Sequence, residues 1–185
     1  MPPKTSFDVS VIVPFYNEVA FINTTIDSIL SQEIDRIEVI IVNDNPAVFK
    51  DEYFESLGLP DCVKVIHHDK NRGLPSSRNT GIDAAQGAYI GFVDADDYYL
   101  PEGLVKQYKS ARKTGADMVH GQAVITFINK SKGQVLRSDA RHLGRKARGV
   151  YEKADVLQAG FAIESSWSSL YRADFLREKS VRFDP

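Results

Sequence analysis

Short runs of apolar residues alternate along the chain with longer stretches of mixed apolar and polar character. Four of the runs are almost wholly apolar and rich in β-branched residues, as strands buried on both faces of a sheet are. They cover residues 9–14, 37–42, 62–66 and 88–93. The stretches between them predict helices at 18–31, 47–57 and 75–85, the first from apolar residues at helical spacing and from Asn17 as a cap. This alternation predicts parallel βαβ units.

After residue 100 the same pattern predicts a helix at 101–115, a strand at 117–128, a turn at 129–133, a returning strand at 134–136, and helices at 152–158 and 172–179. Residues 138–149 are polar and basic, which favours a surface loop and leaves open a flap that closes over an anionic ligand. The whole pattern predicts one α/β domain with a mostly parallel central sheet.

Composition narrows the class of protein. The 185 residues are 43% hydrophobic and 26% charged, and the formal net charge is -2, which argues against a nucleic-acid binder that works by bulk electrostatics. No apolar run approaches the roughly 18 residues of a membrane-spanning helix, and the first eight residues hold no signal-peptide core. The single cysteine excludes an internal disulfide. We therefore expect a soluble domain, without a transmembrane segment in this chain, in a reducing compartment such as the cytoplasm.

Polar clusters follow three of the predicted strands, at residues 14–18, 43–44 and 94–97. In parallel sheets, ligands bind at the carboxyl ends of the strands near a switch in strand order. Asp94, Asp96 and Asp97 are crowded enough to repel one another unless a cation lies nearby, and Mg²⁺ and Mn²⁺ prefer such oxygen ligands. The Asp94-Ala95-Asp96 motif therefore predicts a metal-bound diphosphate, and the alternative is an acidic turn that caps the next helix.

The loop at residues 71–79 adds chemistry that suits an anion. It leads into the start of a predicted helix, where free N–H groups and the positive end of the dipole favour negative charge. Arg78 supplies a forked cation that suits phosphate.

Taken together and in order, these motifs resemble those of the family 2 glycosyltransferases of the GT-A fold. They lie at residues 9–18 (V-S-V-I-V-P-F-Y-N-E), 28–32 (S-I-L-S-Q), 71–82 (N-R-G-L-P-S-S-R-N-T-G-I), 87–97 (G-A-Y-I-G-F-V-D-A-D-D) and 167–183 (W-S-S-L-Y, F-L and V-R-F). The match covers nearly the whole chain. It implies a Rossmann-like, three-layer α/β/α domain over residues 1–185, with a nucleotide-binding half at 1–100 and the start of an acceptor-side half at 101–185.

The resemblance also implies roles for single residues. Asp44 would hydrogen-bond the uracil of a UDP-sugar, and Asp96 would ligate Mn²⁺ or Mg²⁺ that bridges the diphosphate. The residues implied in nucleotide-sugar binding are Pro14, Tyr16, Glu18, Asp44, Asn71, Arg78, Asp94 and Ala95.

Two positions depart from the family pattern. Where the family reads D-D-G-S, this chain has Asn43-Asp44-Asn45-Pro46, which keeps the second acid and loses the Gly-Ser turn. The family also uses a carboxylate base, in an acidic pair shortly after the V-R-F element, to deprotonate the acceptor. We therefore expect the base to lie beyond Pro185, in a longer protein of which these residues are an N-terminal part, and we expect this part alone to transfer little or no sugar.

The expected function is inverting, metal-dependent transfer from a UDP-sugar to a glycan or glycoconjugate acceptor, as in cell-surface polysaccharide synthesis. The longer protein could associate peripherally with the inner face of the membrane. One alternative is a metal-dependent nucleotidyltransferase, which calls for a Gly-rich, lysine-containing loop after the first strand, unlike residues 14–18. The other alternative is a non-catalytic nucleotide- or carbohydrate-binding module.

Overall fold

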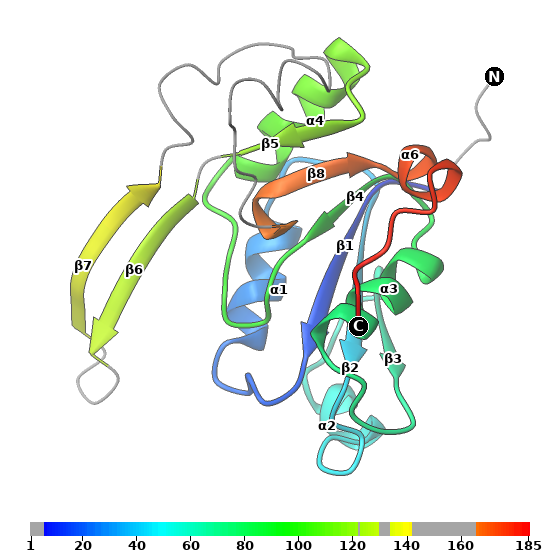
Figure 1. The fold of residues 1–185 in the computed structure, drawn as a ribbon. Helices are drawn as coiled ribbons and strands as arrows, with labels where there is room; N and C mark the ends of the chain where they lie inside the picture. Colours follow the sequence, from blue (N-terminus) through cyan, green and yellow to red (C-terminus); the bar gives the residue numbers. More distant parts are fainter. Residues whose placement is uncertain (1–5, 122, 130–133, 142–165) are drawn as a thin grey trace.

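Buried strands of continuous apolar sequence build the centre of the molecule. The computed structural model describes residues 6–121, 123–129, 134–141 and 166–185. Its main sheet is six-stranded (Figure 1), and the strands in spatial order are β3 (Val63–His67), β2 (Ile37–Asn43), β1 (Phe7–Phe15), β4 (Gly87–Phe92), β8 (Ser169–Arg172) and β5 (Met118–His120). The first four strands in this order pair in parallel, as predicted, and β8 runs antiparallel to both of its neighbours.

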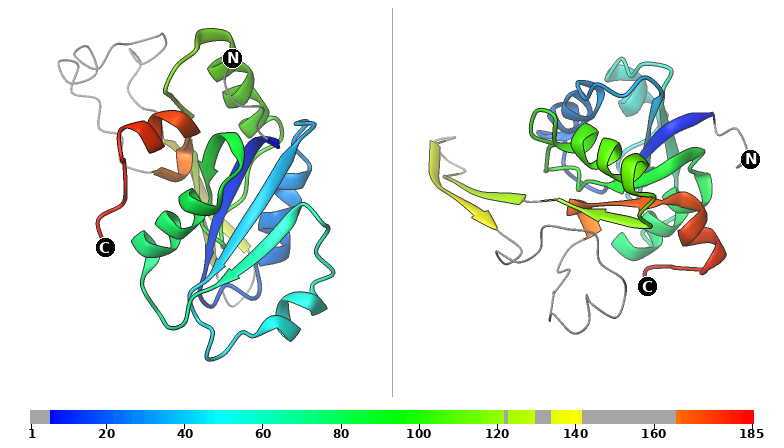
Figure 2. Two further views of the ribbon diagram at one scale, coloured as in Figure 1. Left: turned by 90° about the vertical axis from the view of Figure 1, so that its right-hand side faces the viewer. Right: turned by 90° about the horizontal axis from the view of Figure 1, so that it is seen from above.

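Helices cover both faces of the sheet, so the predicted three-layer α/β/α arrangement is confirmed (Figures 1 and 2). One face carries α1 (Ile22–Leu30), α2 (Asp51–Ser56) and α4 (Gly103–Thr114), and the other carries α3 (Leu74–Ala84) and α6 (Ala173–Glu178). Successive side chains of β1 point to opposite faces of the sheet, so β1 contributes to the core on both faces. Val11 and Val13 belong to the core under α1 and α4, whereas Ile12 belongs to the core under α3 and α6, and all three are fully buried.

The predicted helix starts at residues 18 and 101 were wrong. Helix α1 begins at Ile22 and has no side-chain cap, because the Glu18 carboxylate accepts the backbone N–H groups of Tyr16 and Asn17 and holds that stretch as a loop. Helix α4 begins at Gly103, because Glu102 is in the left-handed conformation with φ of 60°.

The region after α4 also differs from the prediction. The single strand expected at 117–128 is two strands, β5 and β6 (Ala123–Asn129), which pair in different sheets. Strand β6 pairs with β7 (Gln134–Arg141) as expected, in a hairpin that stands away from the central sheet (Figure 1), and β7 takes in the first residues of the predicted loop at 138–149. The rest of that loop and the helix predicted at 152–158 lie outside the described residues.

Strand β8 was not predicted from the sequence. It has only four residues, Ser169–Arg172, directly after a short 3₁₀ turn, η1 (Ser166–Ser168). Its backbone partners come from β4 and β5, which lie far away in the chain. A strand this short carries too little periodicity to be recognised without its neighbours. No helix in the described ranges is long and apolar enough to cross a membrane.

Gly87 offers a test of the packing between β4 and β1. A Cβ atom at this position would lie 2.5 Å from the backbone N of Ser10 and 2.8 Å from the carbonyl carbon of Val9. Because backbone cannot move aside, we expect Gly87→Ala to lower the free energy of unfolding by about 1–3 kcal/mol. Chemical denaturation measures this change.

Gly103→Ala is the matched control for this substitution. A Cβ atom there would meet nothing closer than the Cδ1 atom of Tyr99 at 3.8 Å, and Ala is the better helix former by up to about 1 kcal/mol. Equal destabilisation by the two variants would contradict the close packing of β4 on β1.

Candidate functional site

The carboxyl ends of β1, β2 and β4 meet at one edge of the central sheet. Strand order reverses between β1 and β4, because β2 and β3 lie on one side of β1 while β4 and β8 lie on the other. Asp44 N donates to Phe15 O at 2.8 Å, and Val93 N donates to Ile12 O at 3.1 Å, so the pairing continues past the strand ends. The polar clusters predicted from the sequence therefore lie together at a switch point, where ligands of such sheets bind.

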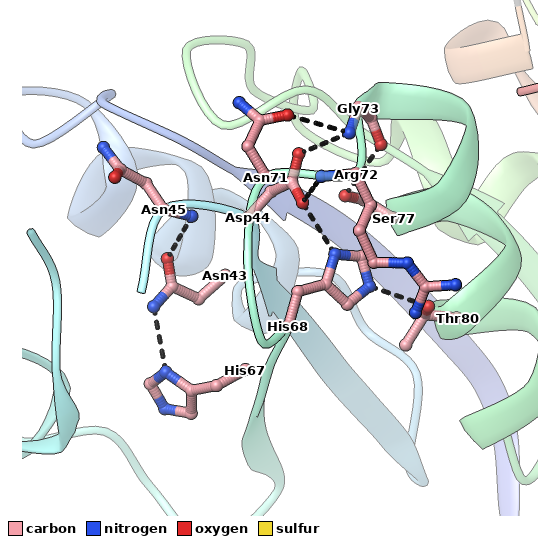
Figure 3. A network of polar contacts seen from close by, with 10 residues as sticks. All are labelled: Asn43, Asp44, Asn45, His67, His68, Asn71, Arg72, Gly73, Ser77 and Thr80. Carbon is pink, nitrogen blue, oxygen red and sulfur yellow. Dashed lines mark hydrogen bonds and ion pairs between the residues drawn. The ribbon is translucent and has the colours of Figure 1, made fainter. Parts of the chain in front are cut away.

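Asp44 is the most heavily bonded of the predicted site residues (Figure 3). Asp44 is 5% exposed. Its Oδ1 atom accepts from His68 Nδ1 at 2.6 Å and from the Arg72 N–H at 2.8 Å, and its Oδ2 atom accepts from the Gly73 N–H at 2.8 Å. Because a carboxylate oxygen accepts, His68 Nδ1 donates to Asp44, and its Nε2 atom is hydrogen-bonded to the Thr80 hydroxyl at 2.8 Å.

These bonds give Asp44 a structural role as well as its predicted one. They fix the turn at Arg72 and Gly73, and Gly73 has φ of 84°, a left-handed conformation that favours glycine. Both backbone N–H groups of this turn are directed at Asp44, so they are already engaged by a negative charge of the protein. Among the described residues, Oδ2 has a single hydrogen-bond donor, the Gly73 N–H, and as a carboxylate oxygen it can accept a further bond. Contact between Asp44 and uracil stays a prediction.

The roles of His68 and Thr80 in this site were not predicted from the sequence. His68 follows β3 directly and is 6% exposed, and Thr80 lies in α3. The only signal in the sequence was the polar run that begins at His67, which is typical of any loop. Tertiary structure was needed to show that two residues 12 positions apart share one hydrogen-bonded chain with Asp44.

Asn43 and Asn45 show how the chain accommodates the departure from the family's acidic turn. The buried Asn43 side chain contacts His67 Nδ1 at 2.9 Å and accepts from the Asn45 N–H at 3.0 Å (Figure 3). It also donates to Phe49 O at 2.6 Å. A carboxylate could not donate to a carbonyl group. The Asn45 side chain in turn donates to Tyr16 O at 3.1 Å, which ties the loop after β2 to the loop after β1.

The end of β1 and the loop after it hold three of the predicted residues. Tyr16 is 44% exposed and is free to contact a ligand. Pro14 is buried within β1, where it pairs with Val42 of β2. Glu18 shapes the loop by accepting the Tyr16 and Asn17 amides at 2.7 and 2.9 Å. Their contacts with a nucleotide-sugar stay predictions.

The acidic turn follows β4. Its ends are joined by a hydrogen bond from Asp97 N to Asp94 O at 2.9 Å. The Asp94 side chain pairs with Arg78 of α3 at 2.8 Å, and the Arg78 guanidinium also lies 5.2 Å from the ring centroid of Phe183. Ala95 is 2% exposed, so its side chain faces inward. The expected contact of Arg78 with a diphosphate is untested, and its partner in the structure is Asp94.

Charge in the acidic turn is incompletely balanced. Asp96 is exposed and has no hydrogen bond or ion pair with any residue that the structure describes. Burial, together with the nearby charges of Asp96 and Asp94, raises the pKa of Asp97 from 3.8 to about 6. Crowded, unbalanced carboxylates of this kind fit a divalent cation.

A cation at this turn would need further ligands. No group of three or more His, Cys, Asp or Glu side chains within the described ranges could hold a metal ion unaided. Mg²⁺ and similar ions are often held by one or two carboxylates together with substrate phosphates. Asp96 fits that role. Asn71, the other predicted residue near the diphosphate, lies in the loop that Asp44 holds, and its side chain accepts from the Gly73 N–H at 3.0 Å.

Replacing the Asp44 carboxylate tests its structural role. Asp44→Asn puts an NH₂ group or a weaker acceptor against three donors, so we expect the free energy of unfolding to fall by about 1–3 kcal/mol. Asp51→Asn is the control, because Asp51 also contacts a histidine, His67, at 3.0 Å but its side chain is 80% exposed. Chemical denaturation of both variants measures the difference. A loss at Asp44 no larger than the loss at Asp51 would contradict this role.

The raised pKa of Asp97 predicts a pH dependence of stability. Its protonated form favours the folded state, so its contribution is fully present below pH 3.8 and is lost as the pH rises through about 6. We expect Asp97→Asn to gain stability relative to the unsubstituted protein between about pH 4 and about pH 7. Chemical denaturation in EDTA measures the gain, with Asp61→Asn, an acid away from the acidic turn, as the control. A difference that does not change with pH would contradict the assignment.

Comparison with known proteins agrees with the sequence motifs. Residues 10–178 match the family model described as glycosyl transferase family 2. The putative glycosyltransferase EpsH of Bacillus subtilis (strain 168) is 32% identical over 176 residues, which cover 95% of this chain and 50% of EpsH. The chain thus spans about half the length of this relative.

Two solved structures share the fold. The structure of S. aureus TarS 1–349 in complex with UDP has a TM-score of 0.65 at 22% identity, and the match covers 96% of this chain and 50% of that one. The mannosyltransferase PcManGT of Pyrobaculum calidifontis, in complex with GDP-Man and Mn²⁺, has a TM-score of 0.62 at 20% identity. The match covers 100% of this chain and 51% of that one. The chain belongs to glycosyl transferase family 2 and has the GT-A fold.

Proposed function

We propose that this chain binds the donor of an inverting glycosyltransferase, a UDP-sugar held with a divalent metal ion. The observation that carries the proposal is the meeting of two different polar sites at the β1/β4 switch point. One is Asp44, a carboxylate fixed as an acceptor by three protein donors. The other is the acidic turn, in which Asp96 is exposed and Asp94 is paired with Arg78.

Asp44 suits the base of the nucleotide. A fixed acceptor favours bases that present an N–H group at the recognition edge, such as the imide of uracil, and disfavours a base with an acceptor there. Guanine also presents an N–H group, and one structural neighbour was solved with GDP-Man while another was solved with UDP. We propose uracil because of the family resemblance of residues 9–18 and 87–97.

Asp96 suits the diphosphate. Together with phosphate oxygens it would hold Mn²⁺ or Mg²⁺, which neutralises the charge that develops on the leaving diphosphate. Arg78, fixed against Asp94 at 2.8 Å, places a second positive charge beside the turn. The exposed ring of Tyr16 lies in the loop that Asn45 ties to the Asp44 loop, and it offers a face for the base.

In the proposed reaction, an acceptor hydroxyl attacks the anomeric carbon, its O–H proton passes to a carboxylate base, and the bond to the diphosphate breaks with the electron pair leaving on UDP. We assign no residue of this chain as that base. The acceptor is proposed to be a glycan or glycoconjugate, on the ground of the resemblance alone. A nucleotidyltransferase would release diphosphate instead, and a binding module would release nothing.

Binding of UDP tests the donor site directly. We expect isothermal titration calorimetry to show UDP binding that is tighter with Mn²⁺ than with EDTA, and tighter than binding of CDP. Asp96→Asn removes the negative charge of the proposed metal ligand and should reduce the Mn²⁺-dependent gain in UDP affinity by about 10-fold or more, as loss of groups around a bound metal does. Asp61→Asn is the control, because Asp61 is an exposed acid just before β3, at the opposite edge of the sheet. Equal UDP affinity in Asp96→Asn and the unsubstituted protein would contradict the assignment.

A further inference from the structure

A row of polar side chains runs along one side of α1 and faces the segment after β4. The row consists of Thr25 and Ser28, which lie on one face of α1, and of Gln32, which lies just beyond the end of the helix. We call it the α1 polar row. Thr25 is fully buried and Gln32 is 5% exposed. The apolar residues of α1 already account for its packing on the sheet, since Ile22, Ile26 and Ile29 belong to the core.

Every member of the α1 polar row bonds to backbone of the segment at 95–104. The Thr25 hydroxyl lies 2.9 Å from Ala95 O and 2.7 Å from Asp97 O. The Ser28 hydroxyl oxygen accepts the Tyr99 N–H at 3.0 Å. These bonds fix the conformation of the segment at successive points along it, whatever side chains the segment carries.

Gln32 extends the row beyond the end of α1. Its side-chain amide donates to Leu100 O at 3.2 Å and accepts from the Leu104 N–H at 3.0 Å. Gln32 thereby also holds the first turn of α4, which begins at Gly103. The segment is bonded to α1 from the acidic turn to the next helix.

The contacts of Thr25 lie at the acidic turn. The two carbonyl groups it contacts belong to Ala95 and Asp97, the residues on either side of Asp96. With the Ala95 side chain buried and its carbonyl group bonded inward, the Asp96 side chain is left exposed. A hydroxyl group has one hydrogen, and Thr25 places it within reach of both carbonyl groups, with Phe21 O of its own helix as a longer alternative acceptor at 3.3 Å. Burying a hydroxyl group costs stability unless it is bonded, so apolar packing alone would be served better by valine.

We propose that Thr25, supported by Ser28 and Gln32, is a positioning residue for the acidic turn. It holds the backbone on both sides of Asp96 so that the carboxylate faces a metal-bound diphosphate without rearrangement. This role rests on the proposed function, because it concerns the same site. Thr25 itself does not touch the ligand.

Thr25→Val tests the proposal, since it keeps the shape of the side chain and removes the hydroxyl group. We expect the Mn²⁺-dependent gain in UDP affinity to fall by about 10-fold, as it does when groups that orient a metal ligand are lost, while UDP affinity in EDTA stays unchanged. In the ligand-free protein, amide hydrogen exchange of Asp97 and Tyr99 should become faster. Thr25→Ser restores the hydroxyl group and should restore both properties.

Thr24→Val is the matched control, because Thr24 is the preceding residue of the same helix and is exposed. It should leave affinity and exchange unchanged. If Thr25→Val does not fold, Ser28→Ala removes the acceptor of the Tyr99 amide, together with a bond from the hydroxyl to Thr25 O within α1, and allows the same comparisons. An unchanged Mn²⁺-dependent gain, or an equal loss in Mn²⁺ and in EDTA, would overturn the positioning role.

Failure of the proposed function gives a different result. If the unsubstituted protein binds UDP equally in Mn²⁺ and in EDTA, the proposed metal-dependent donor site is wrong, and with it the purpose of the positioned turn. Hydrogen exchange then still shows whether Thr25 holds the turn, because that measurement uses no ligand. Unchanged exchange in Thr25→Val would overturn the proposal on its own.

Discussion

Parallel pairing of β1 with both β2 and β4 is the constraint on which the candidate site depends. Strand β1 is hydrogen-bonded along both edges and buried on both faces, so it cannot shift in register without disturbing both halves of the core. Its pairing brings the carboxyl ends of three strands to one edge. Residues that are 50 positions apart in the chain, such as Asp44 and Asp94, are thereby held at the same switch point.

Hydrogen bonds between loops fix the positions of the site residues that the sheet brings together. The Asn45 side chain joins the loop after β2 to the loop after β1, and the Asp44 carboxylate joins it to the turn before α3. On the other side, the α1 polar row fixes the backbone of the acidic turn. The site is therefore organised before any ligand binds, which lowers the cost of ordering it on binding. The same bonds mean that several residues implied in ligand binding also carry structure.

Charge in the site is arranged unevenly. Asp44 has three donors around it, and Asp94 has the Arg78 guanidinium, whose other neighbour is the Phe183 ring. Asp96 has no such partner in the described part of the chain, and the raised pKa of Asp97 reflects burial and the charges beside it. Unbalanced negative charge is thus concentrated at one turn, where a cation and a diphosphate would offset it.

The apolar pattern by itself determined the first half of the fold. The four parallel strands and the position of the acidic turn followed from runs of apolar residues, because strands of a sheet that is covered on both faces are mostly apolar. The motifs also identified the family, since several long motifs in one order rarely occur by chance. The roles of single residues toward a donor, and the division into halves at residue 100, stay predictions.

Tertiary structure alone decided the rest. Strand β8 depends on partners in β4 and β5, and its four residues carry no period of their own. The amide at Asn43 and the imidazole of His68 have roles set by groups far away in sequence, Phe49 O and Thr80 among them. Thr25 looked like an ordinary helix residue, and Gln32 only like part of the motif at 28–32, until the structure showed their backbone partners. Hydrogen bonds between distant residues depend on three-dimensional distance and direction, and local sequence does not specify either.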